Sequence, residues 1–279
     1  KIPVTLASAR ISARTAAHYH YLRQLFSDVL PQVAVVAQTS EDAERYYKLG
    51  ALPERTQVAG NLKFDIEVDQ ATIALGQSLK AALHARPVWI AGSTHAGEEE
   101  QVLQAHRQVL AHQPDALLIL VPRHPQRFAQ VAQWLTAQPF KFVSRSTGHP
   151  PTSEHAVWLI DTVGELMSFY AASDVAFVGG SLVPIGGHNL LEPAALGLPV
   201  LTGPSVFNAP DICEALKAQH ALAQVDSSEA LAEHVIELLS SSTQRRAMGE
   251  AANRVVQQGR GTLNKVLAQI QQQASITLP

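Results

Sequence analysis

The residue types best suited to hold a ligand lie at positions 177–204, in the segment FVGGSLVPIGGHNLLEPAALGLPVLTGP. An apolar run ends there on the pair Gly179-Gly180. A second pair, Gly186-Gly187, leads through His188 and Asn189 into a stretch with helical character. Glycines after a strand let a ligand approach the backbone, and a helix start presents N–H groups and a positive dipole end to an anion. The pattern therefore predicts an anion-binding turn.

Glu192 stands in the first turn of that helical stretch. Its carboxylate can accept hydrogen bonds from both vicinal hydroxyls of a ribose, so that a nucleotide would be held from two ends. An alternative stays open, in which the turn is an ordinary glycine-rich connection and Glu192 complements the helix dipole. The full pattern G-G-H-N-x-x-E-x-x-x-x-G-x-P-V favours the nucleotide.

Further polar groups follow three other predicted strands. Open α/β sheets bind ligands beyond the carboxyl ends of their strands, so residues in these places are expected to form one composite site. Arg123 is the best phosphate ligand among them, because a guanidinium matches phosphate oxygens and stays charged. These groups are Ser93-Thr94-His95, Pro122-Arg123-His124 and residues 162–165.

Strands and helices alternate along the chain, which is typical of a parallel sheet with crossover helices. The predicted strands are 4–7, 33–37, 57–59, 88–91, 116–121, 141–144, 157–160, 175–178 and 200–201. The predicted helices are 13–30, 40–49, 70–83, 97–111, 125–137, 163–171, 190–196, 212–218, 228–240 and a long C-terminal helix from Ser242.

Composition narrows the class of protein. The 279 residues are 46% hydrophobic and 16% charged, which describes a globular core in one large or two medium domains. The net charge of −3 and the absence of a basic run argue against nucleic acid as a partner. The single cysteine, Cys213, excludes an intrachain disulfide framework, and its apolar neighbours indicate a buried filler. No run approaches the roughly 18 apolar residues of a membrane span.

Five phrases of the sequence together carry a family resemblance. In the order of the chain they read G-N-L-K-F-D (60–65), S-T-H-x-G-E-E (93–99), P-R-H-P-x-R-F (122–128), D-T-x-G-E-L (161–166) and the glycine-rich pattern at 186–200. The chain thereby resembles the transferases of 3-deoxy-D-manno-octulosonic acid (Kdo) in lipopolysaccharide synthesis. Their fold is of the GT-B type, with two Rossmann-like α/β domains.

The resemblance implies a glycosyltransferase that moves Kdo from CMP-Kdo to a lipid A precursor at the cytoplasmic side of the inner membrane. It implies no cofactor, and a monophosphate donor has no diphosphate that needs a bridging Mg²⁺. Residues 1–65 are expected to be the end of the N-terminal acceptor domain, 66–87 an interdomain segment, and 88–279 a complete donor-binding domain. The membrane-associating part and the glutamate that acts as base are expected upstream, so this fragment is expected to be soluble and inactive alone.

The resemblance also assigns roles to single residues. Lys63 would stabilise the charge that develops on the leaving phosphate. Val163 stands where the family has methionine, which puts little in doubt because the contact would use the backbone and Glu165. The implied nucleotide ligands are Pro122, Arg123, Val163, Gly164, Glu165, Asn189, Leu190, Leu191 and Glu192. The candidate sugar or phosphate contacts are Ser93, Thr94, His95, Gly187 and His188.

Three alternatives remain open at this level. The 12 histidines raise a metal hypothesis, since His95, His124 and His188 follow three separate strands, but no carboxylate–histidine spacing accompanies them. A second alternative is another GT-B enzyme that uses a UDP-sugar, a transferase or an epimerase, which would also place a glutamate on the ribose. A third is a non-catalytic nucleotide-binding module. Preference for CMP or UDP discriminates the enzymes.

Overall fold

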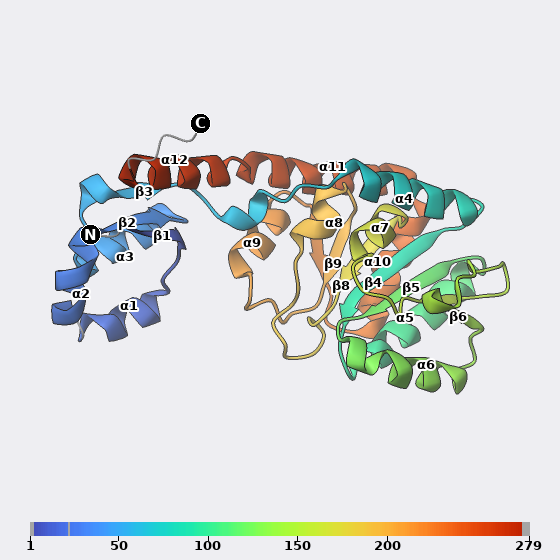
Figure 1. Ribbon diagram of the computed structural model, residues 1–279. Coiled ribbons are helices and arrows are strands. Elements are labelled where there is room, and N and C mark those ends of the chain that lie inside the picture. Colours follow the sequence, from blue (N-terminus) through green and yellow to red (C-terminus); the bar gives the residue numbers. More distant parts are fainter. Residues whose placement is uncertain (1–2, 22, 275–279) are drawn as a thin grey trace. The chain divides into compact units, whose positions relative to one another are not determined.

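The computed structural model describes residues 3–21 and 23–274, which form two compact units (Figure 1). The first unit comprises the described residues up to Asp65 together with those from Gln258 onward, and the second comprises Ile66–Gln257. Both units contain a parallel sheet with helices packed on it, as the alternation of strands and helices predicted.

The two units differ from the predicted domains at both ends of the donor domain. Residues 66–87 lie in the second unit, because Gly76 of α4 (Gln70–Ala82) packs closely on Ala171 of α7 (Leu166–Ala171). Helix α12 (Thr262–Ala274) lies in the first unit instead of the second. Its Val266 packs in a cluster of that unit, and Asp65 accepts hydrogen bonds of 2.6 Å from the N–H groups at positions 261 and 263.

The first unit holds a three-stranded sheet in the order β1-β2-β3 (Val4–Ala9, Val33–Ala37 and Thr56–Val58). The helix predicted over 13–30 is divided into α1 (Ala13–His20) and α2 (Arg23–Val29). Helix α3 (Ser40–Leu49) has the predicted bounds, and the Thr39 hydroxyl caps it by accepting the Asp42 N–H at 3.1 Å. It ends at Gly50, whose φ of 110° is a left-handed conformation that favours glycine.

The second unit holds a seven-stranded sheet in the order β10-β9-β8-β4-β5-β7-β6, and every pairing in it is parallel. The six strands predicted there are all present, five of them with shifted ends. Strand β10 was not predicted, because a three-residue edge strand carries too little pattern. The bounds are β4 Val88–Thr94, β5 Leu117–Pro122, β6 Phe142–Ser144, β7 Val157–Leu159, β8 Val175–Val178, β9 Val200–Thr202 and β10 Leu222–Gln224.

Helices cover both faces of this sheet, so its central strands are buried on both sides. In β4, Trp89 and Ala91 pack with α5 (Glu98–His112) and α10 (Ser228–Ser240), whereas Val88 and Ile90 pack with α7 on the other face. This burial explains why the strands read as continuous apolar runs. The remaining helices are α6 Phe128–Thr136, α8 Leu191–Ala195, α9 Pro210–Ala218 and α11 Ser242–Gly259.

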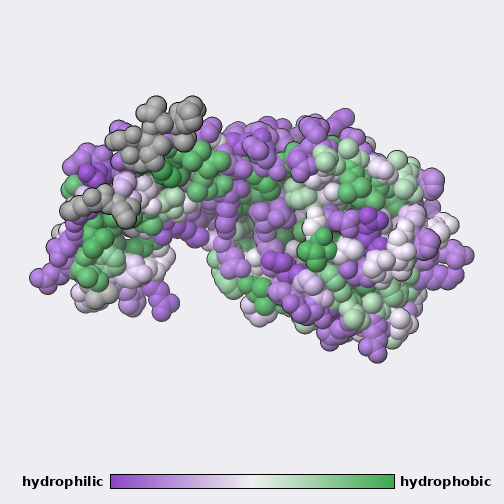
Figure 2. All heavy atoms as spheres, in the orientation of Figure 1, coloured by the Kyte–Doolittle hydropathy of each residue, from purple (hydrophilic) through white to green (hydrophobic). Residues whose placement is uncertain are grey.

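The long helix predicted from Ser242 is interrupted between α11 and α12. Gly259 packs closely on the ring of Phe64, and Gly261 takes a φ of 95°, which a continuous helix does not contain. Helix α11 buries small and branched residues, and the surface along it is hydrophilic (Figure 2). No helix in the described ranges is long and apolar enough to cross a membrane.

Two buried side chains in the second unit have a structural role. Cys213 is buried as predicted, and burial raises the pKa of its thiol. His106, on α5, accepts a hydrogen bond at Nδ1 from the Trp89 indole at 3.0 Å, so its Nε2–H must donate to the Ala156 carbonyl at 2.9 Å. This is the neutral tautomer, and burial lowers the pKa of His106 to about 4.

His106 therefore makes stability dependent on pH. An unfolded histidine has a pKa of about 6.5, so the neutral folded form contributes stability above that pH and loses it as the pH falls toward 4. From pH 7 to pH 5 this one group should lower the free energy of unfolding by about 2 kcal/mol. The replacement His106→Gln removes the titrating group. Denaturant unfolding of this variant at pH 7 and pH 5 should therefore show a smaller decrease in the free energy of unfolding. The exposed His112→Gln serves as the control, and equal losses in wild type and His106→Gln would contradict this assignment.

Candidate functional site

The predicted site residues of the second unit gather at one edge of the sheet because β4 lies between β5 and β8. Gly92 of β4 is in register with Val121 of β5 and with Val178 of β8, and Thr94 is in register with Pro122. All three strands run in the same direction, so their carboxyl ends and the loops that follow them lie together. The structure thus brings together loops 93–97, 122–127 and 179–190.

Three histidine rings meet at this edge. The Nε2 atoms of His95 and His188 are 2.8 Å apart, and the His95 ring lies edge-on to that of His124 with centroids 5.1 Å apart. A single proton lies between the two Nε2 atoms, so one ring donates and the other accepts. Burial, the neighbouring rings and the nearby arginines lower the pKa of His95 and His188, the latter to about 4. Both rings are therefore neutral at pH 7.

The convergence of these rings bears on the metal hypothesis. Among residues 3–21 and 23–274, no group of three or more histidine, cysteine or acidic side chains is placed to hold a metal ion. The Nε2 atoms of His95 and His188 are hydrogen-bonded to each other, which is an arrangement of imidazoles that share a proton. In this conformation the rings can act toward a ligand as hydrogen-bonding groups through their other nitrogens.

Arg123 offers an unpaired positive charge at the same edge. Its backbone N–H donates to the Thr94 carbonyl at 2.9 Å, and its side chain is exposed. Within the described part of the chain, no carboxylate or other acceptor pairs with its guanidinium. The nearby Arg127 differs, because it donates two hydrogen bonds of 2.6 and 3.0 Å to Glu99. Arg123 is thus the guanidinium of this loop that is free to bind an anion.

The turn before α8 depends on glycine. Gly186 and Gly187 have φ values of 102° and 74°, in the left-handed region. A Cβ atom on Gly186 would lie 2.7 Å from the amide nitrogen of Asn208, which donates to the carbonyl of Gly187 at 3.1 Å. The Gly187 N–H in turn donates to the carbonyl of Gly180 at 2.8 Å, so the two glycine pairs of the loop are joined directly.

The free N–H groups of this turn belong to residues 188 and 189, which precede helix α8 (Leu191–Ala195). Helix α8 has five residues, and the Leu191 N–H at its start already donates to Asn189 Oδ1 at 3.1 Å. The side chains of Leu190 and Leu191 are buried, so these two predicted ligands can reach a nucleotide only through their backbone. The N–H groups of His188 and Asn189 have no acceptor among the residues that the structure describes. These two are available to an anion.

Glu192 is half-buried beside this turn, and burial raises the pKa of its carboxyl. The amide of Asn189 donates to its Oε1 at 3.3 Å, and the positive charge of Arg123 opposes the rise. Its Oε2 has no partner within the described ranges. One carboxylate oxygen is thus open to hydroxyl donors, with a guanidinium close enough to stabilise the negative charge.

The segment after β7 is held by a separate network. Glu165 precedes α7 at the capping position, whereas the prediction placed it inside a helix that began at Val163. Its carboxylate accepts from Arg145 at 2.8 Å and from the Thr162 hydroxyl, and the bond from Arg145 lowers its pKa. Gly164 has a φ of 89° and Val163 is 74% exposed. The network therefore fixes a protruding turn.

Lys63 belongs to the first unit, whereas the other candidate residues belong to the second. It lies in the short 3-10 helix η3 (Leu62–Phe64), where its N–H donates to the Asn61 side chain at 3.0 Å. Its side chain is exposed, and no acceptor pairs with its ammonium in the described residues. The structure therefore places Lys63 on the surface of its own unit.

Several residues of this edge were missed by the sequence interpretation. Glu98 and Glu99 stood in the phrase S-T-H-x-G-E-E without a role, yet both are buried. Their signal was the combination of two carboxylates directly after a glycine that follows a strand. Arg145 lay in a hydrophilic stretch that was interpreted only as a loop, and nothing local marked it as the partner of Glu165.

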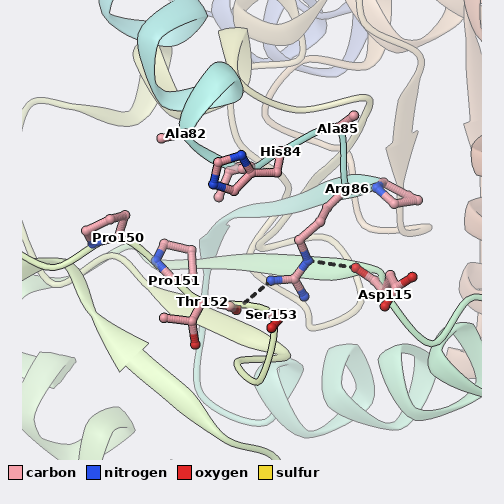
Figure 3. A pocket seen from close by; sticks show the side chains of 11 residues that line it. Ala82, His84, Ala85, Arg86, Asp115, Pro150, Pro151, Thr152 and Ser153 are labelled. Atoms are coloured by element: carbon pink, nitrogen blue, oxygen red, sulfur yellow. Dashed lines mark hydrogen bonds between the residues drawn. The ribbon is translucent and has the colours of Figure 1, made fainter.

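A cavity of about 570 Å³ lies elsewhere, near the amino ends of the strands and around Arg86 (Figure 3). The guanidinium of Arg86 donates to the carbonyls of Asp115 at 2.8 Å, Thr152 at 2.9 Å and His155 at 2.9 Å. These carbonyls occupy its donors, so Arg86 ties the loop before β7 to the start of β5. This cavity contains none of the predicted site residues.

Comparison with known proteins decides the family. A family model described as 3-deoxy-D-manno-octulosonic-acid transferase matches residues 1–66, and one described as glycosyl transferases group 1 matches residues 150–255. The crystal structure of the C-terminal CMP-Kdo binding domain of WaaA from Acinetobacter baumannii is 33% identical, with a TM-score of 0.65, over 68% of this chain and all of that domain. The chain belongs to the Kdo transferase family. The predicted family and fold class are thereby confirmed.

Two further comparisons bear on the length of the chain and on its fold. A 3-deoxy-D-manno-octulosonic acid transferase from Haemophilus influenzae is 41% identical over 95% of this chain, which spans 63% of that protein's length. The Anabaena protein HepE, solved with UDP and glucose, shares the fold with a TM-score of 0.55 over 99% of this chain and 72% of its own, at 16% identity. This Kdo transferase chain therefore corresponds to about two thirds of its relative.

Proposed function

We propose that the protein to which this chain belongs transfers Kdo from CMP-Kdo to a lipid A precursor, and that the second unit binds the donor. The observation that carries the proposal is the group of open ligands at one sheet edge of a Kdo transferase. The unpaired guanidinium of Arg123, the free N–H groups of His188 and Asn189, and the open oxygen of Glu192 lie there together. These are the groups that a nucleoside monophosphate requires.

The proposed contacts follow from the chemistry of each group. Arg123 and the N–H groups of His188 and Asn189 bind the phosphate, because a guanidinium and backbone amides are strong donors to phosphate oxygens. Glu192 accepts from the ribose hydroxyls. Pro122 shapes the chain before Arg123, and Leu190 and Leu191 contribute through their backbone.

The base would be recognised at the turn after β7. The N–H and C=O groups of Gly164 offer the donor and acceptor that a cytosine edge needs, and Val163 provides an exposed apolar surface. Glu165 supports the turn through its bond to Arg145. This assignment predicts a preference for CMP over UMP, which presents a different hydrogen-bonding edge.

The sugar would lie against the histidine pair. Kdo carries a carboxylate and several hydroxyls, and the rings of His95 and His188 supply hydrogen-bonding nitrogens beside the phosphate site. Ser93 and Thr94 precede His95 in the same loop, and Gly187 precedes His188 in the glycine turn. Neutral rings suit this role because they can both donate and accept.

The transfer step also requires groups outside the second unit. We propose that Lys63 stabilises the charge on the departing CMP phosphate. The acceptor hydroxyl would be deprotonated by a glutamate of the full-length protein, with inversion at the anomeric carbon. Association with the cytoplasmic side of the inner membrane belongs to the same proposal, because a lipid A precursor is a membrane lipid.

The ribose assignment can be tested with the variant Glu192→Gln. The amide keeps the shape but removes a charged acceptor, so the affinity for CMP should fall by about 1.5–3 kcal/mol, roughly 10- to 150-fold. Isothermal titration calorimetry in the presence of EDTA gives the dissociation constants. UDP binding with no response to CMP would favour the alternative UDP-sugar enzyme.

A matched ligand makes this test specific for the hydroxyls. Wild type should bind 2′-deoxy-CMP more weakly than CMP, whereas Glu192→Gln should discriminate much less between them, because the contact is already lost. The variant Glu214→Gln, at an exposed position of α9, controls for a change of charge. Equal discrimination by wild type and Glu192→Gln would contradict the contact between Glu192 and the ribose.

The role of Lys63 predicts a split between binding and turnover. An interaction that forms with the leaving-group charge acts on the transition state, so Lys63→Ala should lower the turnover of the full-length enzyme by roughly 10² or more. CMP affinity should change much less. Lys48→Ala, on α3 of the same unit, is the control. Equal loss of affinity and turnover would instead mean that Lys63 contacts the ground state.

A further inference from the structure

The carboxylate of Glu98 is fully buried and accepts four backbone hydrogen bonds. Its Oε1 accepts the N–H groups of Ser181 and Leu182, each at 3.0 Å. Its Oε2 accepts the N–H of Gly180 at 2.7 Å and that of His95 at 3.2 Å. Three of the four donors are consecutive, so residues 180–182 form an anion-binding concavity of the backbone.

The protein's own side chain occupies this concavity. A Cβ atom on Gly179 would lie 2.7 Å from Glu98 Oε2, so the glycine makes room for the carboxylate. Burial raises the pKa of Glu98, and the four N–H donors oppose that rise. The ionised form is the one that can accept all four bonds, because a protonated acid would turn one oxygen into a donor. The first glycine pair therefore serves an internal anion.

The same carboxylate connects the loop after β4 with the loop after β8. Glu98 holds the first loop by accepting the N–H of His95, and the ring of His95 is hydrogen-bonded to the ring of His188 at 2.8 Å. Through the Gly180 N–H it holds the second loop, where the Gly180 carbonyl accepts the N–H of Gly187 at 2.8 Å. Both series of hydrogen bonds thus connect Glu98 to the turn that contains His188.

We infer that Glu98 is a positioning residue of the donor site, which holds residues 93–95 and 179–189 in the conformation that directs His95, His188 and the free N–H groups at the donor. The identity of that donor rests on the proposed function. The four hydrogen bonds to the Glu98 carboxylate, here called the Glu98 clamp, do not rest on it. With the concavity filled, an external phosphate depends on Arg123 and on the N–H groups of His188 and Asn189.

The unmodified chain provides the first test. Hydrogen exchange of wild type, followed residue by residue by NMR, should show slow exchange at Gly180, Ser181 and Leu182, because charge-assisted bonds to a buried acceptor protect loop amides. Exchange of these three amides at the rate of the exposed turn at Gly164 would overturn the inference.

The second test removes and restores the carboxylate. In Glu98→Ala the remaining cavity has the shape of acetate, so acetate should raise the melting temperature of the variant and recover its CMP affinity, whereas the neutral isostere acetamide should do neither. Wild type should respond to neither compound. A folded Glu98→Ala that binds CMP as wild type does, or that responds equally to acetate and acetamide, would overturn the inference.

The isosteric variant Glu98→Gln covers the case in which Glu98→Ala does not fold. The NH₂ group of the glutamine side chain would face backbone N–H groups that Glu98 accepts in wild type. The loops would lose these bonds, so CMP affinity should fall about tenfold. The neighbouring Glu100→Gln, exposed on the same helix, should stay within about twofold of wild type. Equal CMP affinities of Glu98→Gln and Glu100→Gln would contradict the positioning role. If wild type bound no CMP, the proposed function would fail, while amide protection and the acetate-dependent melting temperature would still report the clamp.

Discussion

The parallel direction of all seven strands in the larger sheet is the constraint on which the candidate site depends. Because β4 pairs with β5 on one side and with β8 on the other, the loops after these strands must leave the sheet at the same edge. Helices on both faces bury the central strands and leave the edge as the place where polar residues can meet a ligand. Residues more than 90 positions apart, such as His95 and His188, can therefore share a hydrogen bond.

Internal carboxylates then determine which donors at this edge remain free. Glu98 takes the N–H groups of residues 180–182, and Glu99 takes the guanidinium of Arg127. At this edge, within the part of the chain that the structure describes, the guanidinium of Arg123 and the N–H groups of His188 and Asn189 stay available to an external anion. Protein carboxylates thus occupy the N–H groups after the first glycine pair and the guanidinium of Arg127, whereas Arg123 and the second glycine turn, which the sequence marked for an anion, stay open. This arrangement preorganises the loops, because their buried donors are satisfied before a ligand arrives.

Much of this could be predicted from the sequence. Strand β8 was predicted residue for residue, because a buried parallel strand is a continuous apolar run with glycine after it. The shared edge followed from where the polar phrases stood, and the family followed from their wording. The fate of single donors could not be predicted: the first glycine pair was expected to face a ligand and instead binds Glu98. Nor could the place of α12 be predicted, because it depends on contacts across about 200 residues that no local pattern encodes: Val266 packs on Val36 and Ala59, and Asp65 accepts the N–H groups at 261 and 263.

The most direct test of the central claim is a crystal structure of this chain with CMP, grown without added metal. We expect the phosphate within hydrogen-bonding distance of the Arg123 guanidinium and of the N–H groups of His188 and Asn189, with the ribose hydroxyls on Glu192. Glu98 should keep its bonds to residues 180–182. A phosphate bound by those three N–H groups with Glu98 displaced, or CMP bound in the cavity around Arg86, would contradict the account.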